Sequence, residues 1–170
     1  MTFSNNEILN RLREETCRWV ADHLSSWCNS TVFSLNFKKS AASDTGFQVN
    51  LEEGIARREI ELFCKRVDRA IYGRLVQRFN RRVRRIPFLE FGHDRGWHAH
   101  VIMECPSGMP EIRFRHIVQK AWAESPWSTN LHERMADEGA PFYLTKRRSK
   151  AELEAWIDTI VSEAVFVDTK

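Results

Sequence analysis

Apolar side chains recur at helical spacing in the first half of the chain. Residues 6–25 show this pattern behind a polar N-cap, Ser4 or Asn5. A longer stripe predicts a second helix and runs through Ile60, Phe63, Val67, Ile71, Leu75, Phe79 and Val83. Pro87 cannot lie inside a helix, so it marks the end of this element.

An alternating pattern predicts strands between the helices. Residues 31–38 alternate aromatic or aliphatic side chains with polar ones. Residues 88–91 and 97–104 flank a glycine-bounded turn at 92–96, which is typical of a hairpin. Residues 40–50 are polar and are predicted as a loop.

The C-terminal part has a less uniform pattern. A helix is predicted to begin at Pro110 and to reach about residue 123. Ser149 opens a capping-box match, which predicts a last helix over residues 150–164. Residues 126–140 stay unassigned, and a short strand there is left open.

The order strand, long helix, hairpin, helix is typical of an α+β fold. The expected architecture is a central antiparallel sheet with helices packed mainly on one face. An N-terminal helix in residues 1–30 would precede a sheet domain in residues 31–170, the two forming a single compact unit.

Charge is distributed unevenly along the 170 residues, although the net charge is only +3. Residues 57–85 contain 11 basic and 3 acidic residues, and every basic one except Lys65 is an arginine. The guanidinium fork suits phosphate contacts. The segment therefore indicates a surface for a polyanion, although an arginine-rich helix face can also be merely solvated.

Composition argues against several classes of protein. No apolar run approaches the ~20 residues of a membrane helix, and the first residues do not form a signal peptide. No glycine lies in a P-loop frame. The cysteines are scattered, which argues against a disulfide framework or a zinc knuckle and favours a reducing cytoplasm: Cys17, Cys28, Cys64 and Cys105.

The predicted hairpin carries a candidate metal site. His98 and His100 are two residues apart in a strand, so both imidazoles project from one face and suit a divalent metal. If Gly96 is the last member of a three-residue turn, Glu90 pairs with His100 and its carboxylate shares that face. An even turn would put Glu90 on the other face and leave His93 as the fallback ligand. Such histidine pairs also occur in strands that bind nothing.

One of the two tyrosines is a candidate nucleophile. Tyr72 lies beside the apolar stripe and is expected to pack. Tyr143 is followed by Lys146 and Arg147, and a nearby cation or metal would help a phenol of pKa ~10 to act at neutral pH. On spacing alone, a packed residue beside a solvated basic turn is the better interpretation. Whether Tyr143 lies on a helix or a strand is left open.

Three segments, in order, resemble the motifs of the HUH endonucleases, in particular the single-tyrosine initiators of rolling-circle replication. Residues 32–37 (VFSLNF) are similar to the first motif, a hydrophobic strand ending in a Leu-Asn type pair. Residues 97–101 (WHAHV) resemble the second, in which two histidines flank a hydrophobic residue. Residues 143–146 (YLTK) look like the third. The resemblance covers about residues 31–148.

The resemblance implies a ferredoxin- or RRM-like HUH nuclease fold and a site-specific single-strand DNA endonuclease and ligase. His98 and His100, with Glu90 as third ligand, would hold Mg²⁺ or Mn²⁺ against the scissile phosphate. Tyr143 would attack, leaving a 5′-phosphotyrosyl adduct and a free 3′-hydroxyl, and Lys146 would assist.

The same resemblance implies a DNA-binding surface. Asn36 and Lys38 would lie near the strand. Arginines would contact the phosphates without reading sequence: Arg74, Arg78, Arg81, Arg82, Arg85 and Arg147. The expected substrate is a single-stranded origin or hairpin in plasmid or phage replication, with transposition as a sibling role. Initiators of this family often carry a helicase domain, and none is expected in this sequence, so unwinding would come from a host helicase or the substrate would be an already single-stranded hairpin.

Two rival functions remain open at this point. One is a non-catalytic nucleic-acid-binding module that uses an RRM-like sheet and the basic segment. The other is small-molecule chemistry at Fe²⁺ held by two histidines and a carboxylate. The second rival leaves residues 57–85 and Tyr143 unexplained.

Overall fold

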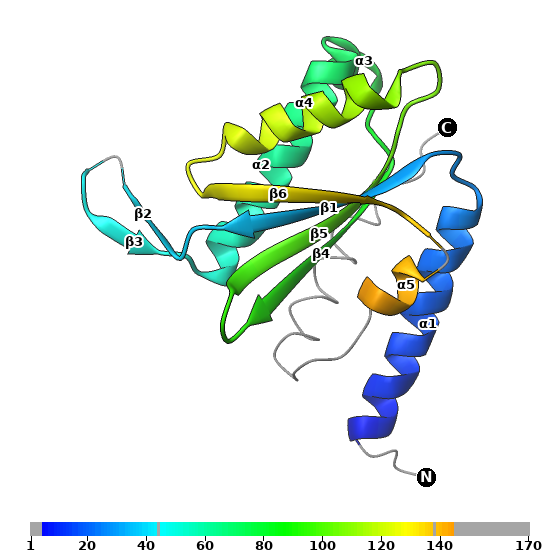
Figure 1. Cartoon of the computed structure of the whole chain (residues 1–170), viewed down its shortest axis with the longest axis horizontal. Coiled ribbons are helices and arrows are strands. Elements are labelled where there is room, and N and C mark those ends of the chain that lie inside the picture. Colours follow the sequence, from blue (N-terminus) through cyan, green and yellow to red (C-terminus); the bar gives the residue numbers. More distant parts are fainter. Residues whose placement is uncertain (1–4, 44, 138, 145–170) are drawn as a thin grey trace.

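The computed structural model describes residues 5–43, 45–137 and 139–144, and an antiparallel sheet lies at its centre (Figure 1). Its spatial order is β4-β5-β1-β6, and the strands are β1 (Ser30–Phe37), β4 (Arg85–Gly92), β5 (Gly96–Glu104) and β6 (Ser128–Met135). The helices are α1 (Asn5–Ser25), α2 (Glu53–Tyr72), α3 (Leu75–Phe79), α4 (Glu111–Ala123) and α5 (Ala140–Leu144). The predicted α+β fold with an antiparallel sheet is confirmed.

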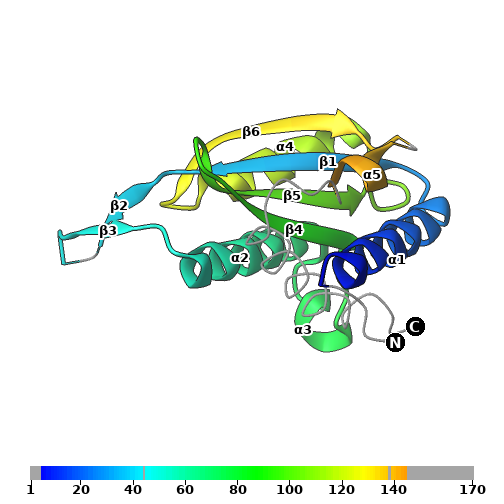
Figure 2. The ribbon, with the colours of Figure 1, turned by 90° about the horizontal axis from the view of Figure 1, so that it is seen from below.

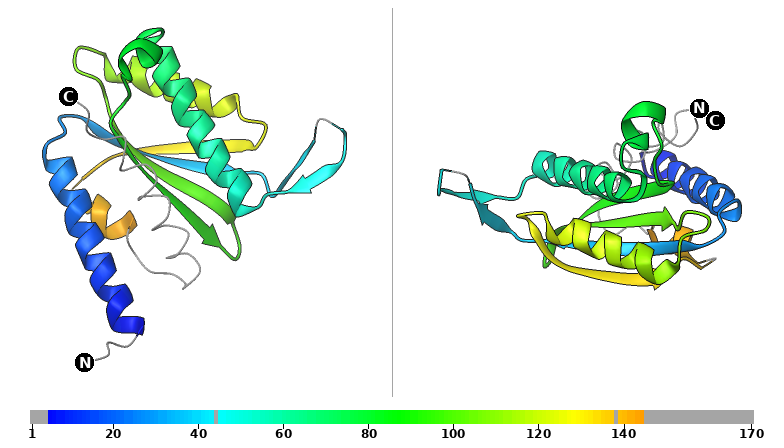
Figure 3. Two further views of the ribbon diagram at one scale, coloured as in Figure 1. Left: turned by 180° about the vertical axis from the view of Figure 1, so that it is seen from behind. Right: turned by 90° about the horizontal axis from the view of Figure 1, so that it is seen from above.

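One face of the sheet, formed by the odd-numbered residues of β1, β4 and β5, carries the main core. Phe33, Leu35 and Val101 are fully buried there beneath α2 and α4. Trp122 of α4 meets Phe37 and Phe63 edge to face, with ring centroids 5.0 and 5.8 Å away. Figure 3 shows α2 and α4 on this side of the strands. The alternation of β1 and the apolar stripe of α2 therefore meet in one interface.

The even-numbered face changes character along the strands. At the end where β1 begins, Val32, Phe88 and Ile102 are buried in a second cluster with residues of α1 and α5. At the other end the same face becomes polar, with Ser34 and His100 among its residues. Figure 2 shows α1 and α5 at one end of the sheet and the β4–β5 turn at the other. The polar end is thus left uncovered by α1 and α5.

The long second helix is shorter than its apolar stripe predicts. α2 stops at Tyr72 because Gly73 adopts a positive φ of 54° and donates its N–H to the carbonyl of Arg69. The stripe continues only through the five residues of α3. The next strand was also predicted to begin too late, since β4 begins at Arg85 and contains Pro87. β4 is an edge strand, where a missing backbone N–H is tolerated.

The structure contains strands in two regions where the sequence predicted a loop or left the structure open. The predicted loop at residues 40–50 is wrong, because it contains a ribbon of two short strands, β2 (Ser40–Ala42) and β3 (Gln48–Asn50). The unassigned stretch contains β6. The predicted helix over residues 150–164 lies outside the described residues. All four cysteines are free, and within the described ranges no helix is long and apolar enough to cross a bilayer.

Candidate metal centre

Glu90, His98 and His100 converge on the polar end of the even-numbered face. One oxygen of Glu90, Oε2, lies 3.2 Å from Nε2 of His98 and 3.9 Å from Nε2 of His100. One ligand atom from each residue lies within 4.8 Å of the other two. Both imidazoles are buried and the carboxylate is half-buried. Among the described residues this is the group whose donor atoms converge as metal ligands do.

The hairpin register explains why the carboxylate shares the histidines' face. The turn is His93-Asp94-Arg95, and Gly96, with a φ of +72°, pairs with Gly92. Glu90 therefore faces His98, and the predicted pairing of Glu90 with His100 is wrong by two residues. A shift of two keeps every side chain on its face. The three-residue turn length was correct, and this odd length brings the carboxylate to the imidazoles.

Hydrogen bonding orients Nε2 of His98 towards the carboxylate of Glu90. Nδ1 of His98 lies 3.2 Å from the carbonyl oxygen of Gly96, which can only accept, so Nδ1 carries the proton of this bond. Nε2 then faces the carboxylate of Glu90, which is also an acceptor. Two acceptors face each other favourably only when a proton or a metal ion lies on Nε2. Two imidazoles and one carboxylate are a donor set that divalent cations bind, so the residues fit such an ion.

The neighbouring strand supplies a partner for His100 that the sequence did not reveal. Oγ of Ser34 lies 2.8 Å from Nδ1 of His100, directly opposite on β1. Ser34 also faces His132 on β6, whose Nε2 accepts a hydrogen bond of 3.0 Å from the side-chain amide of Asn130. The spacing of two residues between Ser34 and Asn36 in the first motif indicates that both lie on one face of β1. Only the β1–β5 register shows that this face is the one with the histidines.

Tyr143 lies in α5, at the covered end of the face that carries the histidines. Ala140 and Leu144 of this helix are buried in the cluster that contains Phe88 and Ile102. Phe88 is the direct strand partner of His100. The question of helix or strand at Tyr143 is thus answered as helix. Lys146 lies outside the described residues.

Of the predicted DNA contacts, two lie beside the metal cluster. Asn36 is the direct partner of His98 across β1 and β5 and is half-buried. Lys38 follows at the end of β1, is exposed, and donates from Nζ to the carbonyl of Pro126 at 2.9 Å. Both residues are therefore at the polar end of the sheet.

The arginines lie at the far end of β4 from the cluster. Arg74, Arg78 and Arg81 are exposed around α3, before the chain enters β4 at Arg85. Glu90 follows five residues later along the strand, about 17 Å at ~3.3 Å per residue. The structure therefore separates these arginines from the histidines. Arg147 lies outside the described residues.

Arg82 and Arg85 are engaged inside the protein. Asp68 of α2 is fully buried and accepts from Nη1 of Arg85 at 2.8 Å and from Nη1 of Arg82 at 3.3 Å. It also accepts from the backbone N–H of Val83 at 2.9 Å. The carboxylate thereby fixes the segment that leads into β4. Arg85 is 7% exposed, so its guanidinium is directed at Asp68 and not at solvent.

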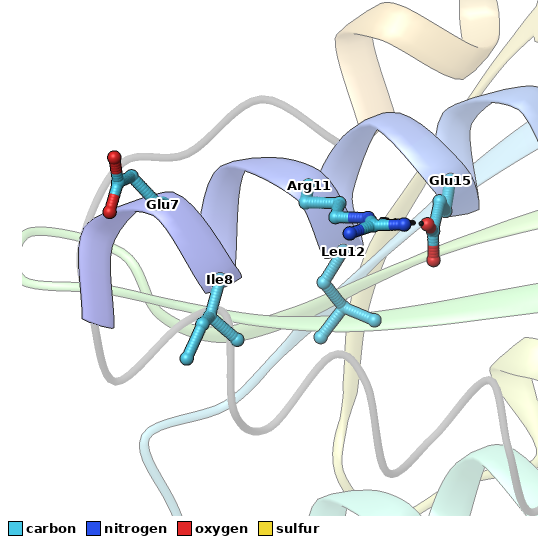
Figure 4. A pocket seen from close by; sticks show the side chains of 5 residues that line it. All are labelled: Glu7, Ile8, Arg11, Leu12 and Glu15. Atoms are coloured by element: carbon cyan, nitrogen blue, oxygen red, sulfur yellow. Dashed lines mark hydrogen bonds and ion pairs between the residues drawn. The ribbon is translucent and has the colours of Figure 1, made fainter. Parts of the chain in front are cut away.

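A depression on α1 has no part in the metal cluster. Side chains of one helix line it: Glu7, Ile8, Arg11, Leu12 and Glu15. Figure 4 shows Ile8 and Leu12 pointing in the same direction, beside an ion pair of 3.1 Å between Arg11 and Glu15. None of these residues belongs to the group of Glu90, His98 and His100.

Comparisons with known proteins give one distant structural likeness. No protein-family model matches the sequence, and no curated protein matches it. A solved structure with some likeness is the N-terminal nuclease domain of non-structural protein 1 of minute virus of mice. It is described as having a unique Zn²⁺ coordination in the active-site pocket and a novel mode of DNA recognition at the origin of replication. The alignment covers 92% of this chain and 71% of that one, at 12% identity and a TM-score of 0.35. A likeness at this level carries no functional argument.

Proposed function

We propose that this protein is a divalent-metal-dependent enzyme that nicks and rejoins single-stranded origin DNA, in plasmid or phage rolling-circle replication. The observation that carries the proposal is the convergence of Glu90, His98 and His100 within 4.8 Å on one sheet face. Two imidazoles and a carboxylate that converge in this way present one donor atom each to a common point, a set that divalent cations bind. The resemblance of three segments to the HUH motifs adds the reaction class, strand cleavage through a phosphotyrosine intermediate.

The metal ligands in this proposal are Glu90, His98 and His100. Mg²⁺ or Mn²⁺ held there would neutralise negative charge on the scissile phosphate. The carbonyl of Gly96 keeps the proton of His98 on Nδ1, so Nε2 is presented to the cation. Ser34 does the same for His100 when its hydroxyl accepts from Nδ1.

The nucleophile in this proposal is Tyr143. Its phenolic oxygen forms a bond to phosphorus while the bond from phosphorus to the 3′-oxygen breaks, and the phenolic proton ends on that oxygen. The products are a 5′-phosphotyrosyl strand and a 3′-hydroxyl, and the reverse reaction rejoins the strand. Lys146 would stabilise the charge that develops on the phenol and the phosphate. Support comes from the position of α5, which packs on the sheet face that carries the metal ligands.

Single-stranded DNA would approach over the polar end of the sheet. Asn36 of β1 lies opposite His98, and Lys38 follows the end of β1, so both residues would contact DNA next to the scissile phosphate. The exposed arginines Arg74, Arg78 and Arg81 would contact phosphates farther along the nucleic acid. Arg147 is proposed for the same role. Arg82 and Arg85 would act mainly through their contacts with Asp68.

The experiment is a search for a covalent adduct. The protein is incubated with Mn²⁺ and a pool of randomised, 3′-labelled single-stranded oligonucleotides, and the products are separated on a denaturing gel. Label is expected to migrate with the protein, and sequencing of the captured strands would define the site. EDTA is expected to abolish the adduct.

The second tyrosine provides a matched control. Tyr72 is at the end of α2, on the opposite side of the sheet, and burial raises the pKa of its phenol above 10. Tyr72→Phe is expected to keep full adduct formation, and Tyr143→Phe to lose it. An adduct that survives Tyr143→Phe would remove the nucleophile assignment. Metal-independent DNA binding without any adduct from the pool would favour a non-catalytic binding module.

A further inference from the structure

The ribbon of β2 and β3 extends beyond the sheet at the end that carries the metal cluster. Its strands pair in a regular antiparallel register, from Ser40 opposite Asn50 to Ala42 opposite Gln48. Figure 1 shows it as the projection farthest from α1, and Figure 2 shows it beyond the β4–β5 turn. The ribbon is therefore a projection from the same end of the sheet as the metal cluster.

The tip of the ribbon is held by several hydrogen bonds yet presents an apolar ring to solvent. The backbone of Ser43 donates to the carbonyl of Phe47 at 2.7 Å, and Oγ of Ser43 accepts from the N–H of Phe47 at 3.1 Å. Gly46, with a φ of +83°, donates to the carbonyl of Ser43 at 2.9 Å. The phenyl of Phe47 is left 75% exposed. A single exposed apolar residue is ordinary, and what sets Phe47 apart is its location at the tip of a projection beside the metal cluster.

The base of the ribbon is tied to the metal-bearing hairpin. Residues 37–39 connect Asn36, the partner of His98, to the first residue of β2, Ser40. The Lys39 side chain lies beside Gly96, where a Cβ on that glycine would be 3.9 Å from Lys39 Cγ. The carbonyl of Lys39 accepts from the N–H of Leu51 at 2.8 Å, which closes the base. The base of the ribbon thus adjoins the start of β5, the strand that carries His98.

Cations lie at the base of the ribbon and in the neighbouring turn. Lys38, Lys39 and Arg95 are exposed there, against two exposed carboxylates, Asp94 of the same turn and Glu52 just after the ribbon. A short cationic track followed by an exposed aromatic ring is the arrangement with which proteins hold unpaired nucleic acid: cations follow the backbone and rings stack on bases. Duplex DNA keeps its base faces stacked and offers none to a phenyl.

We propose that Phe47 stacks on an unpaired base a few nucleotides from the scissile phosphate, so that the β2–β3 ribbon guides single-stranded DNA across the metal cluster. This inference rests on the proposed function for the identity of the strand, and it names the residue that holds the strand beyond the cluster. Each strand of the ribbon has three residues, so the tip lies about 10 Å beyond the base.

Binding without catalysis tests the proposal. A mixed-sequence single-stranded oligonucleotide, with 2-aminopurine placed at successive positions, is titrated with the full chain in EDTA. Phe47→Ala is expected to weaken binding about tenfold, the usual effect of losing one stacked base. 2-Aminopurine at one or two positions should be quenched by the unmodified protein and not by Phe47→Ala. Phe47→Trp is expected to restore binding.

An exposed apolar residue away from both the ribbon and the arginines of α3 is the matched control. Ile112 of α4 is 81% exposed, and α4 packs on the opposite face of the sheet, so Ile112→Ala should leave affinity and quenching unchanged. Unchanged binding by Phe47→Ala, an equal loss with Ile112→Ala, or tighter binding to duplex than to single strand would overturn the proposal. Since the titration needs neither metal nor Tyr143, it can succeed when adduct formation fails. Conversely, if Phe47→Ala forms the adduct with normal yield and binds DNA with normal affinity, the ribbon's role is contradicted while the proposed nicking reaction is not.

Discussion

Ser34 and His100 face each other across β1 and β5, with Oγ of the serine 2.8 Å from Nδ1 of the imidazole. A partner at Nδ1 fixes the ring and the tautomer of a histidine that binds metal through Nε2. Ser34→Ala is therefore expected to weaken Mn²⁺ binding about tenfold, measured by calorimetry, without loss of folding. Ser34→Thr keeps a hydroxyl and should restore affinity.

Ser40→Ala is the control for this effect, because Ser40 is an exposed serine on β2, away from His100. It should bind Mn²⁺ like the unmodified protein. Equal affinities for Ser34→Ala and Ser40→Ala would show that the hydroxyl does not orient the ligand.

The buried pair of Asp68 and Arg85 is expected to matter for stability and not for DNA. Asp68→Ala leaves the guanidinium of Arg85 buried without its carboxylate, so the free energy of unfolding should fall by about 3–5 kcal/mol. Denaturant titration followed by circular dichroism measures this loss. Asp22→Ala, at an exposed position of α1, should change stability by less than ~0.5 kcal/mol. A loss under ~1 kcal/mol in Asp68→Ala would contradict the structural role.

Exposed arginines around α3 are expected to govern the salt dependence of DNA binding. Each phosphate contact to a single strand contributes a slope of about −0.7 to a plot of log affinity against log salt. Arg78→Ala should make this slope shallower by that amount, measured by fluorescence anisotropy. Arg113→Ala removes an exposed arginine from α4 and should leave the slope unchanged. The same slope in both variants would place the DNA elsewhere.

Cysteine reactivity tests the packing of the main core. Burial raises the pKa of the Cys105 thiol above 9, and nearby Glu111 and Glu104 raise it further. A raised pKa means less thiolate at a given pH, so alkylation of Cys105 should remain slow at pH 8 and increase only at higher pH. Cys28 is exposed and should react first. Mass spectrometry of peptides after brief iodoacetamide treatment would show this order, and modification of Cys105 ahead of Cys28 would contradict it.

Local patterns predicted the elements that bury one face over many residues. The helix of α1, the strand of β1 and the hairpin of β4 and β5 follow from spacing, because their apolar positions meet a core. The odd turn length placed Glu90 on the histidines' face even though the register was off by two. Parity depends on turn length alone, whereas register also depends on whether Gly96 belongs to the turn, as predicted, or to β5, as observed.

Other features depend on contacts that no local pattern contains. The strands β2 and β3 have three residues each, too few for a period to be recognised. Pro87 was interpreted as a helix end because its edge position in the sheet was unknown. Arg85 was assigned to DNA because its partner, Asp68, is 17 residues away in sequence. The bond between Ser34 and His100 likewise joins residues 66 positions apart.

Pulsed electron paramagnetic resonance of the protein with one equivalent of Mn²⁺ tests the central claim most directly. Nitrogen couplings from bound imidazoles are expected in the unmodified protein, weakened by His98→Ala or by His100→Ala and unaffected by His116→Ala, at an exposed position of α4. Manganese that shows no nitrogen coupling, or couplings that persist when His98 and His100 are both replaced, would mean that these residues do not form the metal centre.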